Sequence, residues 1–338
     1  TPKPSSAASD VYKRQLLYSL LHLTGYDVSI DDIKNFRQLN SITPGHPECD
    51  ITPGVETTTG PLGQGLANAV GMAIAEKSLA AEFNTKSHIL IDHYTYVFSG
   101  DGCLMEGISH EVCSLAGTLG LNKLIVIYDM NNISIDGDTS IAFTENIKKR
   151  FDSYGWNVID NINGHDHKSI EQSISRAKRE RSKPTIICMK TKIGFGSPNK
   201  EGTSGVHGAP LGSAEVELTR DNLKWNYKPF EIPKYIYKEW SAIKSGSILE
   251  TKWNKSLKSY KKLHPKLYSE LQRRLDNKLP PSLTKKIDTL ISNNDKSMAT
   301  RKSSQVVLEN IGPLLPELIG GSADLKESNL VFWPESKP

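Results

Sequence analysis

The feature that most constrains the fold is the stretch over residues 94–134, which alternates short apolar runs with turns rich in Gly, Asp and Asn. Residues 94–98 and 124–128 are β-branched and aromatic runs ended by turn residues, which predicts two strands. Residues 106–119 place apolar side chains at helical spacing, which predicts a helix between them. Because a helical crossover joins parallel strands, both strands end at the same edge of one sheet. The sequence therefore predicts an α/β fold with a parallel sheet flanked by helices.

Two polar residues follow these predicted strands. Asp101 lies in the turn after the first strand and Asn131 in the turn after the second. Open α/β sheets bind ligands at the carboxyl ends of their strands. Carboxylate and amide oxygens suit hard cations such as Mg²⁺ or Ca²⁺, and Gly100 and Gly102 let the backbone approach a bulky group. A GDG turn alone is more often an ordinary tight turn, but its pairing with Asn131 favours a ligand site.

The composition excludes several classes of protein. The chain of 338 residues exceeds one typical domain, and 24% charged with 37% hydrophobic residues is typical of a globular protein. No window approaches the ~20 apolar residues of a membrane span, so we expect no membrane partner. The cysteines lack zinc-binding spacing, and we interpret them as reduced thiols of a cytoplasmic protein. They are Cys49, Cys103, Cys113 and Cys188.

The net charge of +4 is unevenly distributed along the chain. Residues 226–300 hold 16 Lys or Arg against 7 Asp or Glu. A basic stretch can bind nucleic acid, but this one contains no RNA- or DNA-binding motif. We therefore interpret it as a solvated linker surface and expect no nucleic acid partner.

The first residues differ in character from the rest of the chain. Residues 1–15 are rich in Ser, Ala and Pro without a periodic pattern, and we expect them to be a foreign leader of artefactual origin. A helix is predicted from Leu16 and ends at Gly25. A short polar helix is predicted over residues 30–39.

A turn with His46 precedes a segment with Gly60, Gly63 and Gly65, which opens a long predicted helix over residues 66–83. Glycine-rich backbone at the N-terminus of a helix favours anion binding. Close packing of small residues gives the same glycine pattern, and a turn histidine is more often an ordinary surface residue. Both alternatives stay open on these residues alone.

Two further strands are predicted over residues 156–162 and 184–192, with an amphipathic helix over residues 168–179 between them. His207 lies in the glycine-rich loop over residues 194–212, which follows the last of these strands. Loops at strand ends carry function more often than other connectors do. On this basis a functional and a structural His207 are equally well supported.

The last third of the chain is predicted to be helical, with segments near residues 235–246, 249–275 and 282–293. After these segments the pattern changes, and the sequence predicts a helix over residues 301–318 and a strand over residues 318–325. Together these two elements predict the beginning of a second α/β domain.

Four motifs carry a resemblance to the transketolase family. They are TPGHPE at residues 43–48, VETTTGPLGQG at 55–65, FSGDGCLMEGISHE at 98–111 and YDMNNISIDG at 128–137. GDG followed after 28 residues by NN resembles the signature with which such enzymes bind thiamine diphosphate. The resemblance extends over residues 16–333.

The resemblance implies an order of domains. Residues 16–225 resemble the thiamine-diphosphate- and Mg²⁺-binding domain, residues 226–298 a helical linker, and residues 299–338 the start of the pyrimidine-binding domain. The family's histidine segment ahead of Leu16 is absent from this sequence, and its cofactor-activating glutamate would lie beyond Pro338. We therefore expect the 338-residue chain to be an inactive fragment when it is alone.

The resemblance also implies site residues, with thiamine diphosphate and Mg²⁺ as cofactors and Ca²⁺ or another divalent cation as a substitute. The metal ligands would be Asp101, Asn131 and the backbone carbonyl of Ile133. The cofactor would contact Gly60, Pro61, Leu62, Gly102, Glu106, Asn131 and His207. His46 and His207 would be catalytic. The substrate would contact His46, His207, Arg301, Asp324 and Ser328.

The implied activity is two-carbon ketol transfer between sugar phosphates of the pentose phosphate pathway, carried out by a homodimer. Its substrates would be xylulose 5-phosphate, ribose 5-phosphate and erythrose 4-phosphate. The cofactor supplies the electron sink for this reaction, while the protein binds and orients the reactants. Two alternatives remain open. They are dihydroxyacetone synthase or another sugar-acting enzyme with the same cofactor, and a non-catalytic diphosphate-binding fragment.

Overall fold

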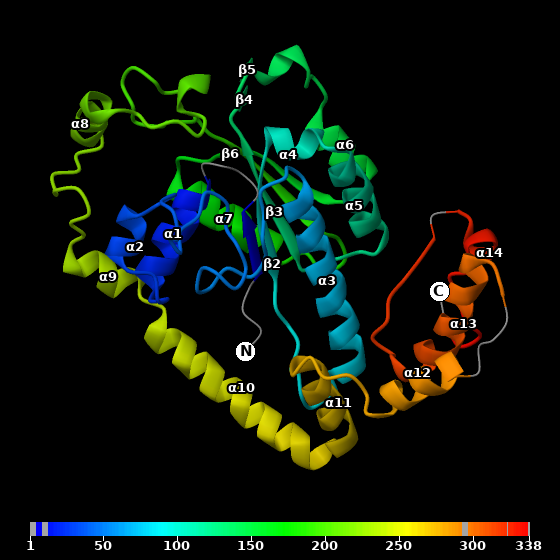
Figure 1. Ribbon diagram of the computed structural model, residues 1–338. Coiled ribbons are helices and arrows are strands. Elements are labelled where there is room, and N and C mark those ends of the chain that lie inside the picture. Colours follow the sequence, from blue (N-terminus) through cyan, green and yellow to red (C-terminus); the bar gives the residue numbers. More distant parts are fainter. Residues whose placement is uncertain (1–4, 9–12, 293–296, 323, 337–338) are drawn as a thin grey trace. The chain divides into compact units, whose positions relative to one another are not determined.

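The computed structural model describes residues 5–8, 13–292, 297–322 and 324–336 (Figure 1). The chain divides into two compact units, Thr1–Ser256 and Leu257–Pro338. Among the described residues, none of the helices combines the length and the apolar character that crossing a membrane requires.

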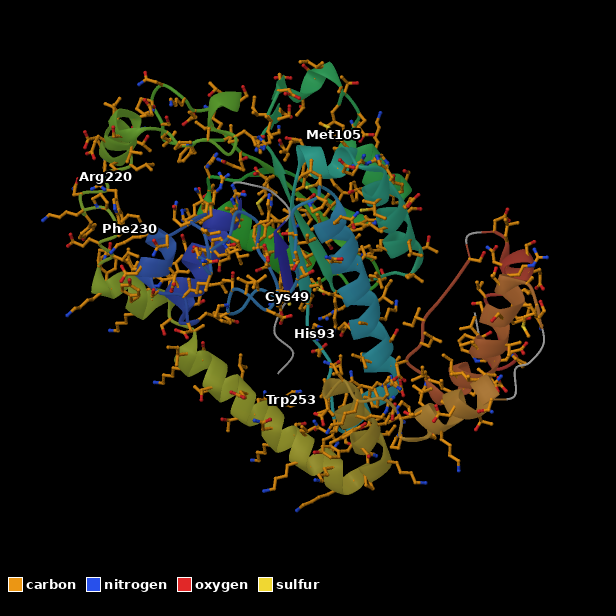
Figure 2. All side chains as sticks on the ribbon, in the orientation of Figure 1. Cys49, His93, Met105, Arg220, Phe230 and Trp253 are labelled. Atoms are coloured by element: carbon orange, nitrogen blue, oxygen red, sulfur yellow. The ribbon has the colours of Figure 1, made fainter. Side chains whose placement is uncertain are left out.

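The division between the units falls inside helix α10 (Ile243–Leu263), whereas the sequence suggested a boundary at residue 225. Trp253 gives the reason, because it ties the first half of α10 to the first unit. Its indole Nε1 donates a hydrogen bond to the carbonyl oxygen of Leu90 at 2.9 Å (Figure 2). The three-part domain order stays a prediction.

The core of the first unit is a five-stranded sheet in which every neighbouring pair of strands is parallel. In spatial order its strands are β1 (Ser5–Ala8), β2 (Thr95–Gly100), β3 (Leu124–Met130), β7 (Thr185–Lys190) and β6 (Asn157–Asn163). The four strands predicted within residues 94–192 are confirmed, with small shifts at their ends. The apolar runs of β3 and β7 are buried, because helices cover both faces of the sheet.

Helices pack against each face of this sheet. Those on one face share a core with Val126 and are α3 (Gln64–Phe83), α5 (Gly107–Thr118) and α6 (Ile147–Ser153). On the other face α7 (His167–Ala177) packs against a core that includes Ile127. Neighbouring residues of β3 thus point to opposite faces, as the two-residue period of a strand requires. Figure 1 shows α3 lying along the sheet.

The N-terminal elements differ from the expectation in two places. Helix α1 (Lys13–Thr24) begins three residues before the predicted Leu16, and β1 lies inside the expected leader. The ladder between β1 and β2 uses backbone groups, which any sequence supplies, so the foreign origin of residues 1–15 stays a prediction. Helix α2 (Ile30–Lys34) is shorter than the predicted 30–39, and Ser29 caps it.

The helix predicted over residues 106–119 is confirmed as α5 (Gly107–Thr118), and a short helix that was not predicted precedes it. A short helix α4 (Asp101–Met105) comes first, and α5 begins after Glu106, whose backbone is extended with φ −67° and ψ 138°. The remaining elements of the first unit lie at its edges. They are β4 (Ile133–Ser134), β5 (Gly137–Asp138), the 3-10 turns η1 (Thr139–Ile141) and η2 (Ser204–Val206), α8 (Ser213–Asn222) and α9 (Lys234–Trp240).

The second unit is helical. Its elements are α11 (Pro265–Leu275), α12 (Ser282–Ser292), α13 (Thr300–Ile311), η3 (Gly312–Leu314) and α14 (Lys326–Asn329). The helix predicted over residues 301–318 ends early, because Pro313 cannot continue it.

The strand predicted over residues 318–325 is wrong for the described part of that segment, residues 318–322 and 324–325. A strand needs a neighbour to satisfy its backbone groups, and the described residues of the second unit contain no strand that could pair with it. The start of a second α/β domain therefore stays a prediction.

Candidate functional site

Strands β2 and β3 bring together the two polar residues that were predicted to bind a metal. Gly100 is in register with Asp129, so Asp101 and Asn131 follow at the same edge of the sheet. Asp101 begins α4 and is 3% exposed. Their predicted placement at neighbouring strand ends is confirmed, whereas their role as ligands stays a prediction.

Two donors hold the carboxylate of Asp101. The hydroxyl of Tyr128 donates a hydrogen bond to Oδ1, and the backbone N–H of Asn132 donates to Oδ2 at 2.9 Å. Burial of Tyr128, together with the nearby charge of Asp101, raises the pKa of the phenol, which therefore stays protonated and able to donate. Sequence reasoning missed Tyr128, because an aromatic residue in an apolar strand gives no sign of what its hydroxyl contacts.

The turn after β3 presents the other two predicted ligands. Asn132 adopts a left-handed backbone with φ 60°, which turns the chain between Asn131 and Ile133. Oδ1 of Asn131 accepts a hydrogen bond from the N–H of Ile133 at 3.0 Å. An amide oxygen has two lone pairs, so this bond is compatible with coordination of a cation.

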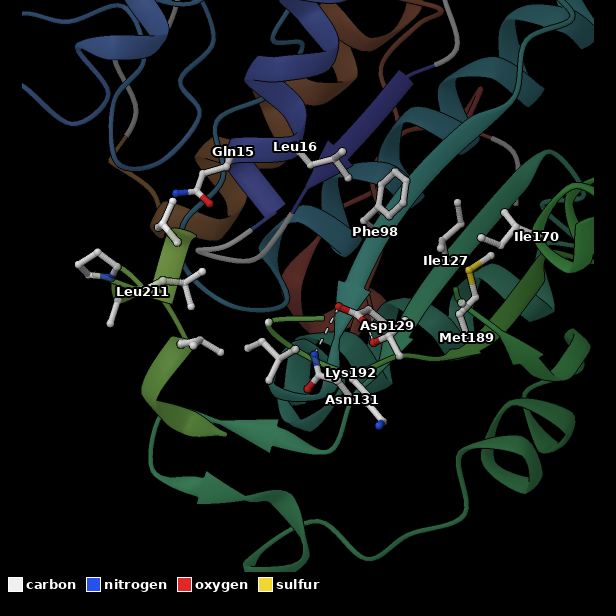
Figure 3. A pocket seen from close by; sticks show the side chains of 18 of the residues that line it. Gln15, Leu16, Phe98, Ile127, Asp129, Asn131, Ile170, Met189, Lys192 and Leu211 are labelled. Carbon is white, nitrogen blue, oxygen red and sulfur yellow. Dashed lines mark hydrogen bonds between the residues drawn. The ribbon is translucent and has the colours of Figure 1, made fainter. Parts of the chain in front are cut away.

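Asp129 and Thr191 form a second polar pair, and Asp129 contacts the side chain of Asn131. Asp129 accepts hydrogen bonds from the hydroxyl of Thr191 and from Nδ2 of Asn131, the latter at 3.4 Å (Figure 3). Thr191 directly follows β7, the other neighbour of β3 in the sheet. Sequence reasoning missed both residues. The sequence did offer one signal for Asp129, namely a carboxylate near the end of the otherwise apolar strand β3.

A pocket of about 750 Å³ opens beside these strand ends (Figure 3). Its polar lining residues are Gln15, Asp129, Asn131, Thr191 and Lys192, and most of its wall is apolar. Such a pocket suits a ligand with an apolar ring and a few polar atoms.

The glycine-rich segment over residues 60–65 packs against the segments that contain His46 and Gly102. A Cβ atom on Gly60 would lie 3.4 Å from the ring of His46, so the loop packs directly on this exposed histidine. A Cβ atom on Gly102 would lie 3.1 Å from Cδ1 of Leu62. The structure thereby places residues of TPGHPE, GPLGQG and GDG side by side, with Pro61 exposed between Gly60 and Leu62.

Gly63 is the point at which the loop enters α3. Its backbone has φ 78°, and a Cβ atom there would lie 2.8 Å from Ile108 and 2.9 Å from Cβ of Glu106. Glycine is therefore required at this position both by the backbone and by the close approach of the two segments. The contact places Glu106 beside the N-terminus of α3.

The remaining predicted residues lie on other segments. His207 is half-buried at the end of η2, and its backbone N–H donates to the carbonyl oxygen of Ser204 at 2.9 Å. Its neighbour Val206 lines the pocket, but His207 itself does not. Three predicted substrate contacts are exposed residues of the second unit, and their roles stay predictions. They are Arg301, Asp324 and Ser328.

The donor set fits a hard cation better than a soft one. Among the residues with described positions, no three His, Cys, Asp or Glu side chains gather as a metal cluster. The predicted set is instead one carboxylate, one amide and one backbone carbonyl, all oxygen donors, which Mg²⁺ and Ca²⁺ prefer. Mg²⁺ also keeps phosphate oxygens in its shell.

Comparison with known proteins agrees with this arrangement. Residues 8–280 match the family described as "Transketolase, thiamine diphosphate binding domain". A transketolase of Buchnera aphidicola (strain APS) is 60% identical over 328 residues, which is 96% of this chain and 49% of that protein. Transketolase 2 of Escherichia coli K12 is 56% identical over 331 residues, 97% of this chain and 50% of that protein.

Solved structures show the same fold. A Pichia stipitis transketolase in complex with xylulose 5-phosphate has a TM-score of 0.92 and 43% identity, over 98% of this chain and 49% of that one. Another from Pichia stipitis, in complex with sedoheptulose 7-phosphate, has a TM-score of 0.91 and 43% identity, with the same coverage. The chain thus spans about half the length of the relatives it matches. Because the family match covers residues 8–280 of 338, this chain belongs to the transketolase family through its thiamine diphosphate binding domain.

Proposed function

We propose that this chain is the cofactor-binding half of a transketolase, an enzyme that transfers a two-carbon ketol unit from a ketose phosphate to an aldose phosphate. The observation that carries the proposal is the oxygen-donor set at the ends of β2 and β3. Asp101 and Asn131 directly follow two adjacent parallel strands, and Ile133 comes two residues after Asn131, in a domain whose family binds thiamine diphosphate. Binding of thiamine diphosphate that depends on Mg²⁺, measured by calorimetry, tests this proposal directly.

The residues present fit the metal and the diphosphate. Asp101, Asn131 and the carbonyl of Ile133 would hold Mg²⁺, and Ca²⁺ or another divalent cation would substitute. The backbone of residues 60–62, together with Gly102, would pack against the cofactor. When bound, thiamine diphosphate supplies the electron sink that no side chain provides. Glu106, beside the N-terminus of α3, would contact the partner subunit of a homodimer.

The two histidines would act on the substrate's oxygens. His46 is exposed beside the glycine loop, and His207 ends a turn whose neighbouring residues line the pocket. A neutral imidazole near pH 7 can hydrogen-bond a hydroxyl or carbonyl oxygen and exchange a proton with it.

Replacing either histidine is expected to slow turnover while the fold is kept. His46→Ala and His207→Ala should each cost about 2–4 kcal/mol of transition-state stabilisation, because hydrogen bonds to developing charge are lost. Steady-state kinetics of a full-length transketolase that carries this chain measures the effect. His167→Ala, at the exposed beginning of α7, is the matched control and should behave as wild type. Wild-type turnover in His46→Ala or His207→Ala would show that the histidine concerned does not contribute to catalysis.

The substrates follow from the relatives. Structures of the Pichia stipitis enzyme are named as complexes with xylulose 5-phosphate and sedoheptulose 7-phosphate. We extend this class to ribose 5-phosphate and erythrose 4-phosphate, with Arg301 and Ser328 toward the phosphate and Asp324 near the cofactor. Arg suits a phosphate because its planar fork makes paired hydrogen bonds.

The 338-residue chain assayed alone is expected to show no ketol transfer. It spans about half the length of its relatives, and the cofactor-activating glutamate that the resemblance implies would lie outside it. Product formation from xylulose 5-phosphate and ribose 5-phosphate, with Mg²⁺ and thiamine diphosphate added, is the measurement. The control is a full-length transketolase under the same conditions. Turnover by the chain at the rate of the control would contradict this prediction, whereas cofactor binding without turnover would match a diphosphate-binding fragment.

A further inference from the structure

His165 lies in the turn after β6, and its ring contacts the segment that follows β7. Nε2 accepts a hydrogen bond from the backbone N–H of Lys192 at 2.9 Å. Because an N–H only donates, Nε2 carries no proton, and the neutral ring holds its proton on Nδ1. The ring also stacks on Phe195, with the ring centroids 3.9 Å apart and the planes inclined by 16°. One imidazole therefore holds two residues of the segment after β7.

The turn that carries His165 is itself attached to the sheet. The N–H of Gly164 donates to the carbonyl oxygen of Lys190, the last residue of β7, at 2.9 Å. A Cβ atom on Gly164 would overlap Cγ2 of Thr191, so the turn lies directly against the end of β7. Oδ1 of Asn163 accepts a hydrogen bond from the N–H of His165 at 3.0 Å. The backbone around His165 is thus anchored at the carboxyl end of the sheet.

The segment held in this way begins the pocket loop, which we define as residues 192–206. Both ends of the loop line the pocket beside the strand ends (Figure 3), through Lys192, Ile193, Gly194 and Val206. A Cβ atom on Gly194 would lie 3.0 Å from Cγ2 of Val206, so the two ends of the loop pack against each other. His207 directly follows Val206. A displacement of the first residues of the loop would therefore reach both the pocket wall and His207.

Hydrogen bonds inside the pocket loop make it a compact unit. The N–H of Gly202 donates to the carbonyl oxygen of Ile193 at 2.8 Å, and the N–H of Gly196 donates to Glu201 at 2.8 Å. Nζ of Lys192 also pairs with Glu201 at 3.0 Å, but the side chain of Lys192 is 67% exposed, so this ion pair contributes little. The position of the loop on the sheet depends instead on the contacts at its base, which include the hydrogen bond and the stack of His165.

We propose that His165 is a positioning residue that keeps the pocket loop in the conformation that binds thiamine diphosphate. This inference rests on the proposed function, in which the chain binds this cofactor. The apparent affinity of a ligand falls in proportion to the fraction of the protein whose site is correctly formed. A tenfold fall corresponds to about 1.4 kcal/mol. One hydrogen bond and one aromatic stack together contribute a free energy of this size.

His165→Ala in a full-length transketolase that carries this chain tests the proposal. Calorimetry at saturating Mg²⁺ is expected to show about tenfold weaker binding of thiamine diphosphate. Hydrogen exchange of the peptide that contains Lys192, measured without cofactor, should be faster in the variant. His165→Gln places an amide oxygen near the position of Nε2, so it should lie between wild type and His165→Ala in both measurements. Unchanged affinity or unchanged exchange in His165→Ala would overturn the role of His165.

His167→Ala is the matched control. His167 is the other histidine of this segment, is exposed at the beginning of α7 and does not line the pocket. The variant should keep the affinity and the exchange rate of the wild type. Equal losses in His165→Ala and His167→Ala would indicate general loosening of the segment and would overturn the specific role of His165.

The wild-type protein separates this inference from the proposed function. If it does not bind thiamine diphosphate, both are overturned. If it binds the cofactor and His165→Ala binds it equally well, only the role of His165 is overturned.

If His165→Ala does not fold, ¹⁵N NMR of wild-type protein with labelled histidine gives a second measurement. Phe195→Leu removes the stacked ring, so it should shift the resonances of His165 and identify them. The hydrogen bond from Lys192 requires that Nε2 of the neutral ring carries no proton, both before and after Mg²⁺ and thiamine diphosphate bind. A proton on Nε2 of the neutral ring would contradict the proposal.

Discussion

Asp101→Ala is expected to abolish the Mg²⁺-dependent binding of thiamine diphosphate, with a loss of affinity above about 100-fold. The basis is that Asp101 is the one carboxylate in the predicted ligand set of Asp101, Asn131 and Ile133. Even a residue that merely orients a metal ligand is worth roughly 10- to 100-fold, and the charged ligand itself contributes more. Calorimetry in a full-length transketolase carrying this chain, with and without Mg²⁺, measures the change.

The buried position of Asp101 requires controls for folding. Asp101→Asn keeps the shape of the side chain and a carbonyl oxygen but removes the charge, so it should fold and still bind the metal weakly. Asp136→Ala removes an exposed carboxylate from the neighbouring turn between β4 and β5 and should bind as wild type does. Unchanged cofactor affinity in a folded Asp101→Ala variant would refute the ligand assignment.

Gly117→Ala is expected to destabilise the first unit by about 3 kcal/mol or more, the upper range for overpacking. Gly117 lies in α5 where the helix passes over the segment after α6. A Cβ atom there would overlap the backbone carbonyl oxygen of Tyr154 and lie 2.9 Å from its carbonyl carbon. Backbone atoms cannot swing aside as the end of a side chain can, so α5 would have to move away from the backbone of Tyr154.

Chemical unfolding monitored by circular dichroism measures this change in the free energy of unfolding. Gly71→Ala is the matched control, because Gly71 lies within α3 and a Cβ atom there would have no neighbour within 4 Å. That variant should gain up to about 1 kcal/mol from the higher helix propensity of alanine. A Gly117→Ala protein as stable as the Gly71→Ala protein would show that α5 does not pack this closely.

The types of element and their order followed from local patterns in the sequence. A β-branched run such as Leu124–Met130 and the helical spacing within Gly107–Thr118 report which faces are apolar, and this information lies within a few residues. The crossover rule then placed Asp101 and Asn131 at one edge, since parallel strands end together. The glycine segment likewise predicted where α3 begins.

Tertiary structure alone decided which distant residues meet. The sequence did not predict that β7 would lie between β3 and β6, an order that brings Thr191 to Asp129. Nor did it predict that the hydroxyl of Tyr128 would donate a hydrogen bond to Asp101. Such contacts depend on how whole elements pack, and one hydroxyl leaves no periodic signal. The strand predicted within residues 318–325 failed for a related reason. A strand's backbone needs a neighbouring strand, and local β propensity cannot say whether one is present.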